Sequence, residues 1–290
     1  MGADRGVREH PAGVYQTSAM AGSPPHDETR RHPSAGNVSS RPTLVQPDEP
    51  LEPLPAISFP HGEEPGRAEV RLGPDLDHTS LVRLLGPLDG RRVLDLGCAA
   101  GSAAVAMARA GARVTAIDPS TARLTRARHA AEVAEVKVEF HHSDLADLAF
   151  VRADSIDAAL AVYSLSQVQD LSRVFRQLHR VLSPEAPLVL SLPHPFATML
   201  EWDHEEQTSP WLTRTFWSEH PLAWRVAGDE GSTHVHQVSA VFTSLQRSNF
   251  RVDTLLEPRP EPGAPGSLHR SALDEWVPPT VVIRARKQGT

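Results

Sequence analysis

The sequence predicts an α/β protein built on a doubly wound, mostly parallel sheet. From residue 79 onward, short apolar runs alternate with segments whose apolar residues recur at helical spacing. This alternation indicates successive strand–helix units. Several runs are apolar almost throughout, which is typical of parallel strands covered by helices on both faces. Ligands of such sheets bind beyond the carboxyl ends of the strands, so functional residues are expected in those loops.

The expected strands are short segments rich in Val, Leu, Ile and Ala, bounded by Gly, Pro, Asp or Ser. The fourth of them is nearly continuous in apolar residues and is expected near the centre of the sheet. The strands are, in chain order, Arg92–Leu96, Arg113–Ile117, Val136–His141, Ile156–Tyr163, Leu188–Leu192, 250–256 and 279–286.

The expected helices are marked by apolar periodicity and by caps. The segment 170–182 is the clearest, because apolar residues follow the i, i+3, i+4, i+7 pattern from Leu171 and Ser183-Pro184 ends it. Ser120 can cap a helix, and Gly111 can end one. The helices are Thr79–Leu85, Ser102–Ala110, Ser120 to about Ala131, 170–182 and 238–249.

Prolines divide the chain. The sequence has 26 of them in 290 residues, and eleven precede Arg67. Residues 1–66 lack apolar periodicity, so they cannot bury enough surface to offset the ordering entropy, and we expect a disordered Pro-rich tail. Residues 67–290 then form one domain. Within it, 194–236 is expected to be an insertion that acts as a substrate lid, because it holds four of the five tryptophans (Trp202, Trp211, Trp217 and Trp224).

Composition excludes several classes of protein. The net charge of −7 and the pI of about 6.1 have the wrong sign for a protein held mainly by phosphate contacts, so no nucleic-acid partner is expected. The single cysteine, Cys98, excludes a disulfide framework and a multi-Cys zinc site. No apolar run approaches the ~18 residues of a membrane helix, and the charged start lacks a secretory h-region. We therefore expect a cytoplasmic protein without membrane insertion.

A small-residue turn follows the first strand. In the stretch VLDLGCAAGS, Gly97, Ala99 and Gly101 precede a helix, so a ligand could approach the backbone closely and meet unpaired amides. The spacing does not fit the dinucleotide pattern G-x-G-x-x-G. If position 99 requires a positive φ, its alanine costs about 1 kcal/mol.

Acidic residues follow the first three strands. Asp95 disfavours a pyrophosphate and suits a ligand with an ammonium group. Asp118 can accept hydrogen bonds from both hydroxyls of a ribose, and Asp144 can accept from an exocyclic amine. Ammonium, ribose and amine together describe S-adenosylmethionine.

At these residues the sequence resembles the class I S-adenosylmethionine-dependent methyltransferases, above all the small-molecule methyltransferases of the ubiquinone and menaquinone type. The resemblance implies a Rossmann-like seven-stranded sheet of order 3-2-1-4-5-7-6, with the last strand antiparallel. It covers roughly 72–287 and is carried by VLDLGCAAG (93–101), VTAIDPS (114–120), HHSDLADL (141–148), the stretch 155–195 and NFRVDTLLEP (249–258).

The resemblance also implies roles for individual residues. Asp95, Gly97 and Gly101, with Ala99 between them, would hold the methionine moiety. The remaining cofactor-binding residues would be Asp118 and the adjoining Pro119 at the ribose, Asp144 and Leu145 at the adenine, and Ala161 and Tyr163 beside the sulfonium.

The loop after the fourth strand narrows the acceptor class. Its sequence Ala-Val-Tyr-Ser is not the Asn/Asp-Pro-Pro-Tyr of amino-directed nucleic-acid enzymes. It also lacks the paired glutamates of protein-arginine enzymes and an acidic cluster for a metal. A metal-independent transfer to a small molecule remains.

Catalytic and substrate candidates follow the fourth and fifth strands. His194 is the expected general base, since histidine titrates near neutral pH, and Tyr163 lies beside it. Trp217, His236 and Ser164 are the expected substrate residues, and no metal site is expected.

The sequence thus predicts S-adenosylmethionine-dependent methyl transfer to a small-molecule acceptor at O, N or C. Two alternatives stay open: a non-catalytic cofactor-binding module, and a nicotinamide-dependent oxidoreductase, which the glycine spacing and Asp95 disfavour. The oligomeric state is not predicted.

Overall fold

The structure is a computed structural model that describes residues 68–74, 76–77, 82–201, 210–226, 229–260 and 272–289. The expected tail, 1–66, and Trp202 lie outside these residues.

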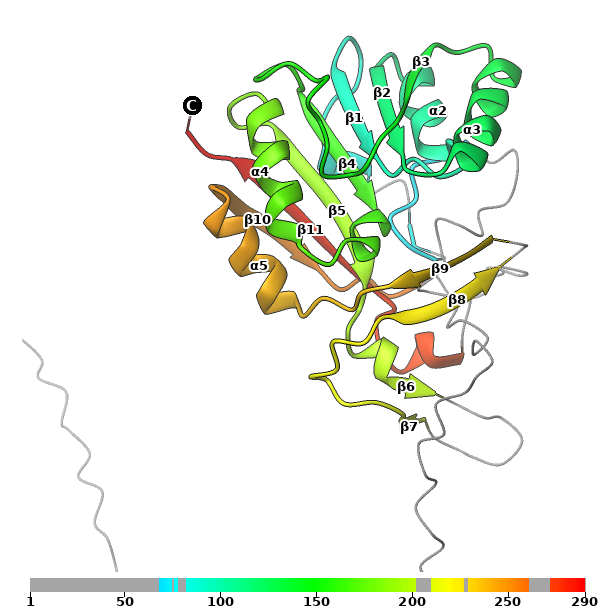
Figure 1. Cartoon of the computed structure of the whole chain (residues 1–290), viewed down its shortest axis with the longest axis vertical. Coiled ribbons are helices and arrows are strands. Elements are labelled where there is room, and N and C mark those ends of the chain that lie inside the picture. Colours follow the sequence, from blue (N-terminus) through cyan, green and yellow to red (C-terminus); the bar gives the residue numbers. More distant parts are fainter. Residues whose placement is uncertain are drawn as a thin grey trace, which may run out of the picture. The chain divides into compact units, whose positions relative to one another are not determined.

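The sheet has seven strands in the described part of the chain, and its order is β10-β11-β5-β4-β1-β2-β3 (Figure 1). Neighbouring strands from β5 to β3 are parallel, whereas β11 is antiparallel to both of its neighbours. This confirms the expected order and the antiparallel strand. The bounds are β1 Arg92–Leu96, β2 Arg113–Asp118, β3 Val138–His142, β4 Ala158–Val162, β5 Pro187–Pro193, β10 Phe250–Leu256 and β11 Thr280–Lys287.

Helices cover both faces of the sheet and bury two separate apolar clusters. On one face, α2 and α3 pack their small residues against β1 and β2. On the other face, α4 and α5 pack against β4, β5 and β11, with Phe175 fully buried. As expected, Ser120 caps α3, its Oγ accepting from the Arg123 amide at 3.3 Å. The bounds are α2 Ser102–Arg109, α3 Thr121–Val133, α4 Leu171–Val181 and α5 Val238–Arg247.

One helix differs from expectation. Of the segment Thr79–Leu85, the structure describes only 82–85, as a single 3-10 turn, η2 (Val82–Leu85). Gly86, with a φ of +79°, ends the turn at the residue where the sequence predicts the helix to end. Among the described residues, no helix is long and apolar enough to cross a bilayer.

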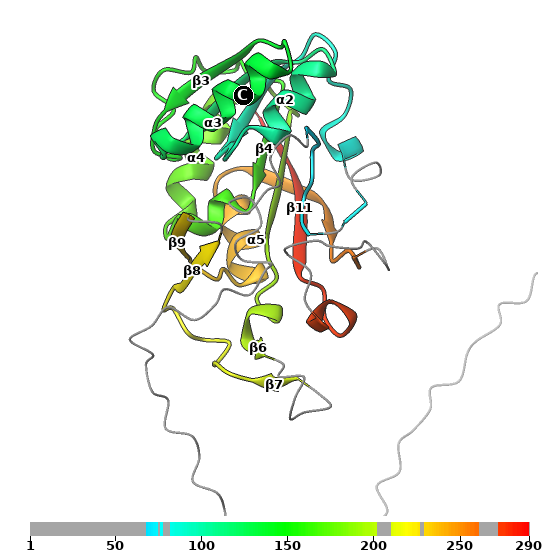
Figure 2. The same cartoon turned by 90° about the vertical axis from the view of Figure 1, so that its right-hand side faces the viewer.

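Smaller elements lie beyond the carboxyl ends of the parallel strands (Figures 1 and 2). Two antiparallel pairs, β6–β7 and β8–β9, form here; we call the described parts of 194–236 the cap. Its role as a lid stays a prediction. The bounds are η4 Ala197–Met199, β6 Leu200–Glu201, β7 Trp211–Leu212, β8 Leu222–Val226 and β9 Asp229–Thr233, and η5 Ala272–Glu275 lies near them.

The turn between β1 and α2 needs residues that tolerate left-handed backbone. Gly97, Ala99 and Gly101 have φ of 78°, 48° and 89°. A Cβ on Gly97 would lie 2.2 Å from the Cβ of Ser164, so no side chain fits there. The amides of Gly97 and Cys98 both donate to the Ile117 carbonyl, at 2.8 and 2.9 Å, and this ties the turn to β2. The positive φ considered for Ala99 is therefore present.

We expect Ala99→Gly to raise the free energy of unfolding by about 0.5–1 kcal/mol, because glycine removes the left-handed strain of an L-residue. Gly97→Ala should lower it by roughly 2–4 kcal/mol through strain and overlap with Ser164. Urea denaturation of each variant measures the change.

The neighbouring Ala100 is the matched control, since its φ is not positive. Ala100→Gly should destabilise by about 0.5–1 kcal/mol through added chain entropy. Equal effects of glycine at 99 and 100 would contradict the turn geometry.

Candidate active site

Two buried carboxylates lie at the carboxyl edge of the sheet. Asp95 is in β1 and Asp118 ends β2, and their exposed fractions are 2% and 1%. The strands are parallel and paired in register, so both acids reach the same edge. Burial of two carboxylates side by side is unfavourable unless each finds partners.

Asp118 has its partners within the chain. One oxygen accepts from the Ala99 amide at 3.0 Å, and the other accepts from the Ser120 amide at 2.8 Å. Arg123 lies 3.4 Å from the second oxygen. Burial raises the pKa of Asp118, whereas Arg123 and the two amides oppose that rise. This carboxylate therefore joins the glycine turn, the end of β2 and the start of α3.

Asp95 is different, because no donor in the described part of the chain reaches its buried Oδ2. Burial, with a smaller contribution from the charge of Asp118, raises the pKa of Asp95 to about 7. A buried carboxylate oxygen without a partner is rare in native proteins. It fits a ligand that brings a cation with N–H donors, such as an ammonium group.

The third acid is more exposed. Asp144 follows β3, and its Oδ1 accepts from the Ala146 amide at 2.8 Å. Leu145 is 3% exposed and packs in the core, while the Pro119 carbonyl accepts from His142 Nε2 at 2.9 Å. Ala161 is fully buried within β4. All four belong to the carboxyl halves of strands or to the loops after them, as expected, but their contacts with a cofactor stay predictions.

The residues after β4 serve the turn. Tyr163 has a φ of 54°, and its hydroxyl lies 2.6 Å from Thr280 Oγ1 in the start of β11. Burial raises its pKa. The Ser164 hydroxyl donates to the Leu96 carbonyl beside Gly97. Both hydroxyls are therefore engaged within the protein, and the roles expected for Tyr163 and Ser164 beside the sulfonium and the acceptor stay predictions.

His194 follows β5 at the same edge. Its Nε2 lies 3.0 Å from Oε1 of Glu257, and its Nδ1 accepts from the Phe196 amide at 3.2 Å. This pattern gives the neutral tautomer with the proton on Nε2. Sequence reasoning missed Glu257. Only the sheet order, which brings the end of β10 to the level of β5, could have identified it.

The two cap histidines hold the cap to the loop after β4. The His234 amide donates to the Ser166 carbonyl at 2.6 Å, and His236 Nε2 donates to the Val168 carbonyl at 2.9 Å. Burial lowers the pKa of His236. Among the described residues, no cluster of His, Cys, Asp or Glu could hold a metal.

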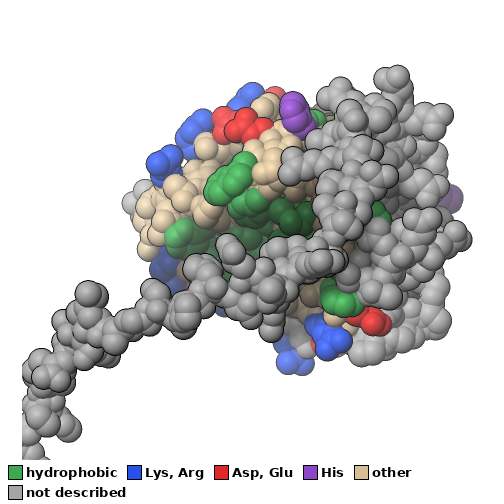
Figure 3. Space-filling model, turned by 90° about the horizontal axis from the view of Figure 1, so that it is seen from below, with side chains coloured by type: hydrophobic (Ala, Val, Ile, Leu, Met, Phe, Trp, Pro, Cys, Tyr) green, Lys and Arg blue, Asp and Glu red, His purple; other side chains and the backbone are tan. Residues whose placement is uncertain are grey.

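The cap aromatics differ in exposure. Trp224 is 2% exposed and packs over Gly231. Trp217 is 74% exposed and meets Phe216 edge-to-face at 5.4 Å, and Phe196 is also exposed. Hydrophobic side chains gather on this end of the molecule (Figure 3). Trp224 is therefore a core residue of the β8–β9 hairpin, whereas Trp217 and Phe196 are available to a ligand.

Residues 93–185 match the family model of a methyltransferase domain. Two relatives are ubiquinone biosynthesis O-methyltransferases. That of Alkalilimnicola ehrlichii is 38% identical over 112 residues, which are 38% of this chain and 45% of the relative. That of Xanthomonas oryzae is 38% identical over 104 residues, which are 36% of this chain and 44% of the relative. The chain thus matches less than half the length of these relatives.

Solved structures of similar fold extend the match beyond residue 185. A S-adenosylmethionine-dependent methyltransferase from Mesorhizobium loti is 27% identical, with a TM-score of 0.61 over 72% of this chain and 96% of that one. One from Methanosarcina mazei is 21% identical, with a TM-score of 0.53 over 72% and 97%, and shows the fold alone. With a glycine turn and paired acids at the expected edge, the chain is similar to a methyltransferase domain over residues 93–185 and shares the fold of solved S-adenosylmethionine-dependent methyltransferases.

Proposed function

We propose that this chain transfers the methyl group of S-adenosylmethionine to a small-molecule acceptor without a metal. The observation that carries the proposal is Asp95, a buried carboxylate just before the glycine turn whose Oδ2 meets no donor among the described residues. S-adenosylmethionine brings an ammonium group that can donate to this oxygen. A nicotinamide dinucleotide would instead bring a pyrophosphate to a carboxylate, which is unfavourable.

The cofactor-binding roles rest on this geometry and on the family. Asp95 would hold the ammonium and Asp118 the ribose hydroxyls, with Asp144 and Leu145 at the adenine. Asp118 already accepts two backbone amides, so its carboxylate is fixed in place before any ligand arrives. A site fixed in this way loses little entropy on binding.

Bound S-adenosylmethionine supplies an activated methyl group, and the chain supplies orientation, exclusion of water and a proton acceptor. His194 is our candidate for the residue that accepts this proton. Because Nε2–H is directed at Glu257, the basic lone pair of the His194 ring is on Nδ1. This lone pair accepts a hydrogen bond from the Phe196 amide at 3.2 Å. Nδ1 can take a proton from the substrate once that weak contact opens, and Glu257 would stabilise the resulting cation.

The cap supplies the acceptor pocket in this proposal. The family match ends at residue 185, before the cap begins. The match therefore supports the cofactor site but gives no information on the acceptor site. The relatives' name specifies an oxygen acceptor, and exposed aromatics in the cap favour an apolar or aromatic molecule. Transfer of tritiated methyl groups to a metabolite extract, followed by identification of the product, tests this class. Cofactor binding without any transfer would instead identify a non-catalytic module.

Cofactor affinity should depend on pH through Asp95. The Asp95 pKa is about 7 in the folded chain against 3.8 for an ordinary Asp, so the free protein loses stability as pH rises from about 4 to about 7. An ammonium partner favours the ionised form. The dissociation constant should therefore fall as pH rises from 6 to 7.5, with release of a proton at pH 6, as calorimetry in buffers of different ionisation enthalpy measures.

Asp95→Asn should abolish this pH dependence and weaken cofactor binding at pH 8 by about tenfold or more. In the absence of cofactor, the free energy of unfolding of Asp95→Asn at pH 8 should be higher than that of the parent. Glu132→Gln, an exposed change on α3, is the control and should leave both properties unchanged. A proton-independent affinity in the parent protein would refute the role of Asp95.

Substitutions in the acceptor site should separate turnover from cofactor binding. We expect His194→Ala to lower kcat by about 10²-fold or more, as loss of a general base does, and Trp217→Ala to raise the acceptor KM. Both should keep the cofactor dissociation constant within about twofold of the parent.

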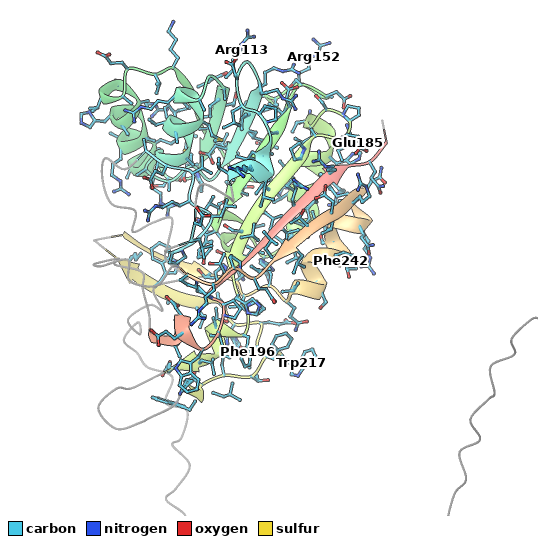
Figure 4. The ribbon with its side chains drawn as sticks, turned by 180° about the vertical axis from the view of Figure 1, so that it is seen from behind. Arg113, Arg152, Glu185, Phe196, Trp217 and Phe242 are labelled. Carbon is cyan, nitrogen blue, oxygen red and sulfur yellow. The ribbon has the colours of Figure 1, made fainter. Side chains whose placement is uncertain are left out.

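Phe242→Ala is the matched control for Trp217. This aromatic is 38% exposed on α5, away from the labelled cap residues (Figure 4). Its KM should equal that of the parent. Unchanged turnover in His194→Ala would show that His194 is not the general base. Equal loss of cofactor and acceptor binding in Trp217→Ala would contradict a role of Trp217 in binding the acceptor.

A further inference from the structure

A cavity of about 650 Å³ opens at the amino edge of the sheet, opposite to the acids. Its wall includes Arg92 and Arg113, the first residues of β1 and β2, and Lys137, which precedes β3. At about 3.3 Å per residue along a strand, Arg92 lies roughly 10 Å from Asp95 and Arg113 roughly 17 Å from Asp118. The cavity is therefore separate from the cofactor site. Figure 4 shows Arg113 and Arg152 at the end opposite to Phe196 and Trp217.

Four cations line this cavity, and within the described residues only Arg92 has a carboxylate partner. Arg92 donates to both oxygens of Asp157, at 2.8 and 3.1 Å, and this pair holds the Asp157 pKa at about 2. Arg113, Lys137 and Arg152 make no ion pair within the described part of the chain.

One acid also lines the cavity, but it is directed to another group. Glu139 lies 2.7 Å from His141 Nε2. The concave wall thus carries an excess of positive charge in a chain whose net charge is −7. Like charges gathered in a concavity repel one another and attract anions.

The rest of the wall is largely apolar, with Thr115 and Ser155 among its lining residues, and hydrogen bonds hold its loop in place. Phe150 is 45% exposed and stacks on His141, with ring centroids 4.2 Å apart. Arg180 of α4 donates to the carbonyls of Val151 and Leu148, at 2.9 and 2.6 Å. These bonds fix the loop that forms one side of the cavity. The wall is therefore a preformed surface, and it offers an exposed aromatic ring beside unpaired cations.

We propose that this cavity binds a small organic anion: a phosphate or carboxylate group on an apolar or aromatic body. Arg113, Lys137 and Arg152 hold the anionic group, and Phe150 contacts the body. The volume lies within the ~300–1,000 Å³ of small-ligand sites. Inorganic phosphate alone would satisfy the cations but leave Phe150 exposed to water. This site is independent of the proposed methyl transfer.

The test uses 2-naphthyl phosphate, inorganic phosphate and 2-naphthol, each titrated into the full chain with and without saturating S-adenosylmethionine. Naphthyl phosphate should bind at least about tenfold more tightly than either other probe, because it fills both parts of the site. Its affinity should be unchanged by S-adenosylmethionine. Equal affinity for inorganic phosphate, or displacement by S-adenosylmethionine, would overturn the proposal.

Variants distinguish the two parts of the site. The double variant Arg113→Glu/Arg152→Glu should weaken naphthyl phosphate about tenfold or more. The control Arg173→Glu/Arg176→Glu makes the same change of charge on the exposed face of α4 and should leave the affinity within about twofold. Phe150→Ala should weaken naphthyl phosphate but not inorganic phosphate. Equal loss in both double variants would show a general charge effect and refute the site.

Circular dichroism and cofactor titration of every variant show that the domain is folded. None of the substitutions removes Arg92 or Asp157, so we expect the ion pair between them at the amino edge of the sheet to remain. A folded Arg113→Glu/Arg152→Glu variant that binds naphthyl phosphate as the parent does would also refute the proposal.

Discussion

The carboxylate of Asp118 holds the site together, because it bonds both the turn after β1 and the start of α3. It accepts from Ala99 on one oxygen and from Ser120 on the other. These two amides belong to the turn before α2 and the cap of α3. Hydrogen bonds to a charged acceptor are about twice as strong as neutral ones, so this one side chain links the turn before α2 firmly to the start of α3. Left-handed Ala99 is held in its strained conformation by the same contact.

The two ends of the central strands differ in charge. Asp95 and Asp118 lie at the carboxyl edge, and Arg92, Arg113 and Lys137 lie at the amino edge. The amino edge of the sheet is therefore basic, although the net charge of the chain is −7. Net charge excludes a surface built mainly for phosphate contacts, but it does not describe each cavity.

Most of the fold could be predicted from the sequence, because buried parallel strands are apolar almost throughout and helices such as α4 show their period directly. Strands β1 and β10 have the expected bounds, and the positive φ considered for Ala99 is present. Side-chain partners could not be predicted in this way. Glu257 is 63 residues from His194, and only the register of β10, β11 and β5 brings them together.

The direction of a side chain was equally hidden. Tyr163 follows β4 as a cofactor residue would, yet its left-handed backbone places the hydroxyl against Thr280. Ser164 likewise faces Gly97, whose missing side chain leaves room for it. Both hydroxyls stabilise the turn, although their positions in the sequence favour contacts with a ligand. Position relative to a strand end predicts which edge a residue occupies, but not which of its neighbours it bonds.

The buried carboxylate of Asp95 lowers the stability of the folded chain, and the reason is local. Asp95 is buried next to Asp118, and no residue that the structure describes donates to its Oδ2, so the folded chain either carries an unpaired charge or binds a proton there. A hydrophobic residue at this position would remove that penalty, as it does for many buried ions. The aspartate at position 95 is understandable if a cationic group completes the site. A ligand that binds only the native state then returns the lost stability, by an amount that grows with the logarithm of its concentration above the dissociation constant. The same reasoning explains why Asp118, whose bonds are already made, can serve as the fixed part of the site while Asp95 responds to the ligand.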